Sequence, residues 1–256
     1  MNIHLSDNEL ITSYKNSILC EFLVGSHLYG TNTESSDKDY LCIYVPSLNE
    51  INSFTNTHHQ FQIKENGCDY ILTNIQSFIR NLLNGDATIN FELIHSESIL
   101  NSPISFFYEV KDKFRTYNII KAYLGFAKRD LNSYQHHKQL KHGIRSYFAA
   151  KKLLNFTYSN IPDDFLLSLY SEIDNNDYSS NFKLANSYLT KVNELRKSLN
   201  ALHNNNEIVK YLDIDTQVYL DECVFDLLNS DSYKEKIIKY RNINLIYKYN
   251  ETQIKY

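Results

Sequence analysis

A polar stretch near the start of the chain, residues 25–40, limits the folds open to this sequence more than any other segment. It lies between two short apolar runs, residues 20–24 and 41–45. Short apolar runs bounded by turn-forming residues are typical of buried β-strands. The stretch opens with Gly25-Ser26, a pair that favours a tight turn. We therefore predict a strand, a turn opening a short helix, a polar loop and a second strand.

The polar groups of this stretch have a joint chemical use. A Gly-Ser turn at a helix start presents backbone N–H groups and a hydroxyl, which hold phosphate oxygens. Asp37 and Asp39 open the second strand, where alternate side chains share a face and Lys38 points the other way. Two carboxylates beside a phosphate cradle suit Mg²⁺, which prefers oxygen ligands and often shares substrate phosphates. The alternative is a solvated turn, because residues 35–39 also have turn composition.

The spacing of these groups resembles the core motif of the DNA polymerase beta-like nucleotidyltransferase superfamily. That motif is a Gly-Ser pair, a spacer of about ten residues and Asp-x-Asp on the next strand. Its positions are matched here by Gly25, Ser26, Asp37 and Asp39. Gly30 and the Ser36-Asp37 pair resemble the form found in the small and the predicted nucleotidyltransferase branches of this superfamily.

The resemblance covers about residues 20–155 and implies a small mixed β-sheet nucleotidyltransferase core, residues 1–100. The helical pattern that follows predicts an all-helical domain, residues 101–256, which makes the fold class α+β. The implied reaction moves an NMP from an NTP to an acceptor hydroxyl and releases pyrophosphate, with two Mg²⁺ ions that Mn²⁺ can replace. The implied metal ligands are Asp37 and Asp39, and the implied nucleotide contacts are Gly25, Ser26 and Ser36.

The resemblance also implies a third carboxylate on a neighbouring strand downstream, and Asp69 is placed for it. Asp69 lies one residue into the apolar run 68–72. A buried carboxylate without a partner is costly, so a metal ion explains an acid at this position. We therefore predict Asp69 as the third catalytic and metal-binding residue, with Glu65 as the substitute. The alternative is that Asp69 only caps the turn before it.

Two later segments resemble elements of one branch of the superfamily, the predicted nucleotidyltransferases associated with RNA repair. Residues 82–93 are similar to its Gly-Asn-Pro…Leu-Glu-Leu segment, with Asp86-Ala87 in place of Asn-Pro. Residues 141–145 resemble its helical Lys/His…Arg element. Lys141 and Arg145 share a helical face, and we predict that both contact the triphosphate. His142 and Glu92 are interpreted as structural residues.

The acceptor is suggested by the distribution of charge. Residues 111–152 hold eleven Lys and Arg against two acids, although the whole chain has a net charge of −4. A basic segment in an acidic chain favours phosphate binding. This basic segment and the resemblance to the RNA-repair branch together favour a polynucleotide 3′ end, most simply of RNA, as the acceptor of the NTP-derived nucleotide. Two alternatives stay open: a protein side chain or small molecule as acceptor, and a non-catalytic module that binds a nucleotide or partner.

Hydrophobic periodicity and turn residues predict the remaining elements. We expect a helix over residues 7–19, and a hairpin of residues 59–63 and 68–72 around Asn66-Gly67. With motif strands at 20–24 and 38–45, this gives a small mixed sheet with helices on one face. An apolar helical stripe then runs from Ile75 to Leu83 and stops at Gly85. Longer helices are predicted over residues 103–114, 116–133, 137–155, 163–172, 181–203, 215–229 and 231–240.

The cellular setting is predicted from what the sequence lacks. Its four cysteines form no Cys-x-x-Cys pair, and its apolar runs are too short to span a membrane. The first residues lack the basic and apolar regions of a signal peptide, so we expect no export. We therefore expect a cytoplasmic protein with reduced cysteines and no membrane partner.

Overall fold

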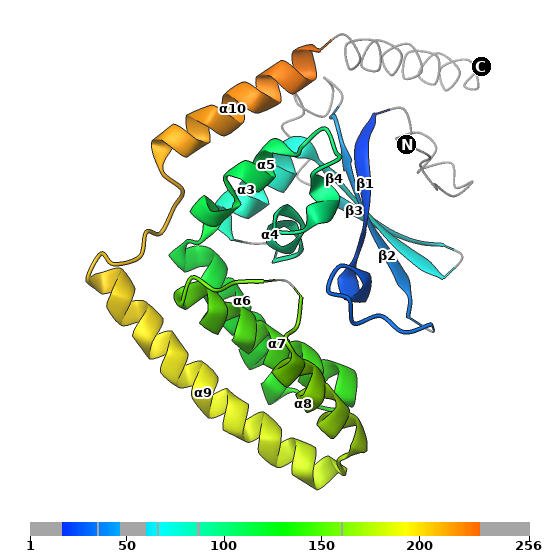
Figure 1. Cartoon of the computed structure of the whole chain (residues 1–256), viewed down its shortest axis with the longest axis vertical. Coiled ribbons are helices and arrows are strands. Elements are labelled where there is room, and N and C mark those ends of the chain that lie inside the picture. The colour runs from blue at the N-terminus through cyan, green and yellow to red at the C-terminus, as the bar shows by residue number, and fades with distance from the viewer. Residues whose placement is uncertain are drawn as a thin grey trace, which may run out of the picture.

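The computed structural model describes residues 17–34, 36–46, 60–65, 67–85, 88–159 and 161–230. These residues form a mixed α/β structure, with a four-stranded sheet at one side of a larger helical part (Figure 1). The expectation of a small mixed sheet followed by helices is confirmed.

The sheet has the strand order β1-β2-β4-β3. Strands β1 (Ile18–Val24) and β2 (Lys38–Tyr44) are antiparallel, and β2 runs parallel to β4 (Cys68–Asn74). Strand β3 (Gln60–Glu65) pairs antiparallel with β4, and Gly67 in the turn between them has φ +75°. The predicted motif strands and hairpin are therefore confirmed, while Asn66 lies outside the described residues.

The expected first helix over residues 7–19 needs correction at its end. Residues 1–16 lie outside the described residues, and Ile18 begins β1 instead of ending a helix. The segment from Ile18 to Val24, apolar except for Glu21, fits a mostly buried strand, and its first residues also fit a helical spacing. Pairing with β2 makes this segment a strand instead of a helix, because Ile18 lies opposite Tyr44 of β2.

The two faces of the sheet contact different cores. Phe22, Leu41 and Ile43 belong to the large core that the helices share, whereas Cys42 and Leu72 belong to a small core on the opposite face. All core residues from the described helices belong to the large core, which agrees with the prediction of helices on one face. Alternation along each strand therefore decides which side chains point toward the helices.

Helix α3 (Ile75–Asn84) follows β4 directly and is well capped at both ends. The Asn74 side chain accepts a hydrogen bond from the Ser77 N–H at 2.7 Å. Gly85 ends the helix with φ +71°, as predicted, and a Cβ at Gly85 would lie 2.7 Å from the backbone of Asn118. A side chain is therefore excluded where α3 meets the start of the next long helix.

The predicted helix over residues 103–114 is wrong as a single element. The segment forms a short α5 (Phe106–Glu109) and a separate 3₁₀ turn, η3 (Lys111–Phe114). Val110 leaves helical geometry at φ −107°, ψ 9°. A β-branched residue at this position weakens the helix, while the flanking Phe107 and Phe114 are both buried.

The other predicted long helices are confirmed within a few residues. Asp163, Asp177 and Asp213 each accept a hydrogen bond from a backbone N–H of the first turn that follows, which sets the helix starts. The predicted helix 231–240 lies outside the described residues. The bounds of the remaining helices are α4 (Thr88–Ile94), η2 (Glu97–Ile99), α6 (Tyr117–Asn132), α7 (His137–Leu154), α8 (Asp164–Asn175), α9 (Tyr178–Asn204) and α10 (Ile214–Asn229).

The helices build outward from the sheet. Helices α3, α4 and α5 lie nearest to it, α6 packs on α7 and α9, and α10 returns toward α5 (Figure 1). The large core continues from the sheet through α6 into α9, so the division at residue 100 stays a prediction. No helix of the described part of the chain is long and apolar enough to cross a membrane.

Candidate active site

Two of the predicted carboxylates are brought together by the sheet. Asp39 on β2 and Asp69 on β4 are direct partners in the parallel register. Both have the strand parity of Leu41, so both lie on the face that the helices cover. Asp37 precedes β2 with the same parity and is exposed. The sequence predicted this cluster, and the strand pairing supplies it.

The Gly-Ser turn lies directly against this cluster. Val24, the last residue of β1, pairs with Asp39, and η1 (Gly25–His27) follows at once. Gly25 has φ +65°, and a Cβ there would lie 2.5 Å from Oδ2 of Asp39. The Ser26 carbonyl accepts a hydrogen bond from the Thr31 N–H at 2.9 Å, which closes the loop. The backbone of the loop therefore lies against the Asp39 carboxylate. Any residue other than glycine at position 25 would push that carboxylate away.

The site holds more negative charge than its own cations balance. Burial raises the pKa of Asp39, and the charges of Asp69 and Asp37 raise it further. Lys138 at the start of α7 and Lys64 on β3 act in the opposite direction. Lys138 thus lies close enough for its charge to act on Asp39. In the sequence, Lys138 is one lysine of the basic segment, and no pattern distinguishes it as a site residue.

Asp69 already has cationic and amide neighbours from the adjacent strand. Lys64, its direct cross-strand partner, places Nζ 2.9 Å from Oδ2 of Asp69. The Gln62 amide donates to the same oxygen at 3.4 Å. These contacts fix the direction of the Asp69 side chain. The side chain of Glu65, the predicted substitute, lies outside the described residues.

The three carboxylates offer oxygen donors, the ligand type that Mg²⁺ prefers. Among the described residues no three His, Cys, Asp or Glu side chains, these aspartates included, are arranged so that they could hold a metal ion by themselves. Mg²⁺ is commonly bound through one or two carboxylates, with water and substrate phosphates as its other ligands. The oxygen donors of Asp37, Asp39 and Asp69 match that preference. A cation among them would also relieve the repulsion that raises the pKa of Asp39.

Ser36 supports the loop between the two motif strands. Its hydroxyl accepts a hydrogen bond from the Thr33 N–H at 2.8 Å and lies 3.2 Å from the Thr33 hydroxyl. Ser36 therefore shapes the turn that leads into Asp37. Its predicted contact with the nucleotide stays a prediction.

The two predicted triphosphate contacts of α7 are paired with other carboxylates. Lys141 places Nζ 2.6 Å from Oδ2 of Asp174 on α8. Arg145 donates to Glu92 at 2.8 Å, and its side chain is 11% exposed. Both residues share a helix with Lys138, but each is engaged away from the aspartate cluster. Their contact with a triphosphate stays a prediction.

His142 makes a polar contact that the sequence did not reveal. Its Nδ1 contacts Oδ2 of the nearly buried Asp130, and Arg129 donates to the other carboxylate oxygen at 2.7 Å. Burial lowers the pKa of His142, and the nearby Arg145 lowers it further. His142 therefore joins α6 to α7, which agrees with its interpretation as a structural residue.

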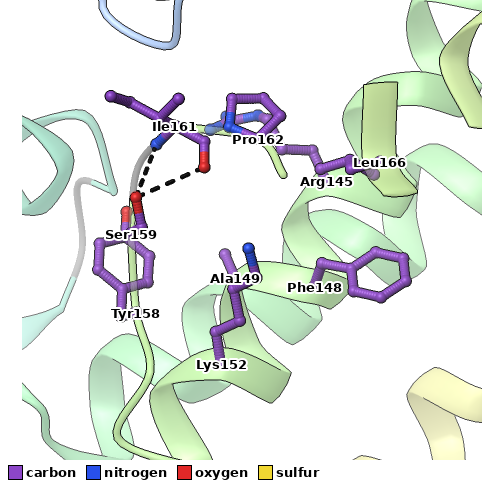
Figure 2. Close-up of a pocket in the computed structure, with 9 residues that line it drawn as sticks. All are labelled: Arg145, Phe148, Ala149, Lys152, Tyr158, Ser159, Ile161, Pro162 and Leu166. Carbon is purple, nitrogen blue, oxygen red and sulfur yellow. Dashed lines mark hydrogen bonds between the residues drawn. The ribbon is translucent and has the colours of Figure 1, made fainter. Parts of the chain in front are cut away.

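A pocket opens between α7 and the chain that follows it. Figure 2 shows Ala149 and Lys152 of α7 on one side and Tyr158, Ser159 and Ile161 on the other. None of the three aspartates lines it. The ammonium of Lys152 is paired with Asp163 at 2.9 Å. The carboxylate chemistry therefore belongs to the edge of the sheet and not to this pocket.

Comparison with known proteins gives three findings. Residues 4–179 match the family described as RlaP, the RNA repair pathway DNA polymerase beta family. An uncharacterized 38.9 kDa protein from the nrdC-mobD intergenic region of Enterobacteria phage T4 is 28% identical over 125 residues, or 43% of this chain. That match spans 36% of the phage protein, so the chain corresponds to about a third of that relative.

A solved structure gives a weaker likeness. The alignment with a nucleotidyltransferase-like protein from Exiguobacterium sibiricum covers 90% of this chain and 84% of the other chain. The sequence identity is 12% and the TM-score is 0.26. These values are too low for a residue-by-residue comparison.

Proposed function

Because the chain belongs to the RNA repair pathway DNA polymerase beta family, we propose that it is an Mg²⁺-dependent nucleotidyltransferase that acts on RNA. The acceptor oxygen forms a bond to the α-phosphorus of an NTP, and the bond from that phosphorus to the bridging oxygen breaks. Pyrophosphate leaves, and the acceptor carries one additional NMP. Such a transfer depends mainly on positioning and charge neutralisation.

The observation that supports this proposal most strongly is the contact between the Gly-Ser loop and the paired aspartates. Asp39 and Asp69 are register partners on parallel strands, and the backbone of Gly25 lies against Asp39. A loop that offers backbone N–H groups next to two carboxylates suits a metal-bound triphosphate. A polar turn without chemistry does not require glycine to lie against a carboxylate.

Each residue of the cluster has a distinct proposed role. Gly25 and Ser26 hold phosphate oxygens through the backbone and the hydroxyl, and Asp37 and Asp39 hold the metal. When bound, the metal supplies charge stabilisation at the transferring phosphorus. Asp69 accepts the proton of the acceptor hydroxyl and completes the oxygen donor set.

The proposed acceptor is an RNA 3′ end. The family description names RNA repair, and the basic segment 111–152 includes Lys138, whose charge acts on Asp39. Lysines on α6 and α7 that bind phosphates would make affinity fall steeply with salt. This dependence separates an RNA acceptor from a small uncharged one.

The proposal is tested by offering each labelled NTP with Mg²⁺ to pools of RNA and of protein. Wild type is compared with Asp39→Asn and with Asp226→Asn, a matched change at an exposed aspartate of α10. We expect label in RNA for wild type and Asp226→Asn, and a loss of at least about 100-fold for Asp39→Asn. Label in protein instead would overturn the RNA acceptor. Equal labelling by all three proteins, or none by wild type, would overturn the catalytic proposal.

A further inference from the structure

A buried carboxylate, Glu92 on α4, joins the Gly-Ser loop to the helical part of the molecule. We propose that Glu92 is a positioning residue that holds the loop 25–31 through Tyr29, with Arg145 as the ion-pair partner of Glu92. This inference rests on the proposed function, since it assigns to the loop the phosphates of the NTP.

The contacts around Glu92 are short and come from three directions. Tyr29 donates its hydroxyl to Oε2 at 2.5 Å, and Tyr123 of α6 donates to Oε1 at 3.0 Å. Arg145 of α7 donates to Oε1 at 2.8 Å. Tyr158 lies 3.1 Å from the Tyr123 hydroxyl and extends the cluster. Glu92 is thus hydrogen-bonded to the loop and to two helices at once.

Arg145 also contacts the loop directly. Its guanidinium lies 3.7 Å from the ring centre of Tyr29 and stacks on that ring. The hydroxyl of the same ring donates a hydrogen bond to Glu92. A guanidinium that binds one side chain by stacking and its partner by an ion pair fixes both. Tyr29 is therefore held at its ring and at its hydroxyl.

Burial makes these contacts strict. Glu92 is 0% exposed, and a buried carboxylate is tolerated only when it is paired and hydrogen-bonded. Burial alone would lower the pKa of Arg145, but the charge of Glu92 outweighs this and holds it above its usual range. Burial and the charge of Glu92 raise the pKa of Tyr29, so its hydroxyl stays protonated and donates.

The place of Tyr29 in the loop makes this a matter of geometry as well as stability. Tyr29 follows Ser26 by three residues, and the next residue, Gly30, is exposed. Leu28 is buried in the large core beside it. The loop is therefore fixed where Leu28 and Tyr29 enter the molecule, and that anchorage sets the direction of the backbone N–H groups near Ser26.

The test uses Tyr29→Phe, which removes one hydroxyl and leaves the ring under Arg145. The matched control is Tyr219→Phe, since the Tyr219 hydroxyl donates to Glu109 at 2.9 Å between α10 and α5. We expect Tyr29→Phe to raise KM for the NTP about tenfold, with a smaller change in kcat. The control should leave both unchanged, although both variants lower the unfolding temperature.

A second readout does not depend on activity. Backbone hydrogen exchange of residues 25–31 should become faster in Tyr29→Phe and not in Tyr219→Phe. Unchanged exchange in this loop, or an equal rise in KM for the two variants, would overturn the positioning role. If wild type neither binds nor transfers NTP, the proposed function fails, while the exchange rates still decide whether Glu92 and Tyr29 hold the loop.

Discussion

Replacing Gly25 with alanine should disable the site by displacing Asp39. The new Cβ would lie 2.5 Å from Oδ2 of Asp39, whereas ordinary contact begins near 3.4 Å, so the carboxylate must retreat by about 0.9 Å. A misplacement of about 1 Å in a site that works by positioning costs about 100-fold in rate. The left-handed φ of +65° adds about 1 kcal/mol of backbone strain.

Two other glycines separate the collision from the strain. Gly30 and Gly67 have φ of +67° and +75°, and an added Cβ would meet nothing within 4 Å at either position. All three alanine variants should lose about 1 kcal/mol of unfolding free energy in urea denaturation. The Gly25 variant alone should lose about 100-fold in kcat for labelled NTP transfer. If Gly30→Ala and Gly67→Ala lose as much activity as Gly25→Ala, the collision with Asp39 is not the cause.

Three further changes probe the buried pair, a buried histidine and the lysine next to Asp69. Glu92→Ala leaves Arg145 buried and unpaired, so the free energy of unfolding in urea should fall by about 3–5 kcal/mol. A Glu92→Met/Arg145→Met double variant should be more stable than Glu92→Ala, and a double variant that is no more stable would contradict this reasoning. Burial lowers the pKa of His95 to about 4, below its ordinary 6.5. The free energy of unfolding should therefore fall by up to about 3 kcal/mol as the pH falls from 6.5 toward 4. His95→Gln should make the free energy of unfolding less dependent on pH in this range. Lys64→Gln removes a cation that competes for Asp69, so half-maximal transfer should need about two- to fivefold less Mg²⁺; an unchanged requirement would show that the lysine does not compete.

The local sequence was sufficient to predict the strands and the hairpin, whereas the placement of Asp69 beside Asp37 and Asp39 was implied by the family resemblance. Asn66-Gly67 predicts the hairpin, and the hairpin places Asp69 on the strand that pairs with β2. The apolar runs beside Gly25-Ser26 predict both motif strands. The hairpin prediction succeeds because turn chemistry and the register within a hairpin depend on residues that are close in the sequence.

Partners from distant segments could not be predicted in the same way. Helical spacing correctly places Lys141 and Arg145 on one helix, but it does not show that Asp174 and Glu92 are their partners. Glu92 lies in an apolar run, and its burial becomes clear only when α6 and α7 close over α4. Lys138 is likewise one lysine among many until the fold brings its charge within reach of Asp39.

Boundaries failed where two periodicities overlap. Ile18 fits both a helical and a strand pattern, and pairing with Tyr44 assigns it to β1. The apolar residues of 103–114 fit a helix, but the bend at Val110 divides the segment. In both cases tertiary packing outweighs local preference.

The central claim is that Asp39 and Asp69, next to the Gly25 loop, form a site for nucleotidyl transfer to RNA. Its most direct measurement is incorporation of labelled NTP into a short RNA with a free 3′ hydroxyl, compared with the same RNA ending in a 3′-deoxy residue. We expect one pyrophosphate to be released for each labelled nucleotide incorporated. We expect no incorporation into the 3′-deoxy RNA, and none by the Asp39→Asn variant. Label in the 3′-deoxy RNA, or full activity of Asp39→Asn, would contradict it.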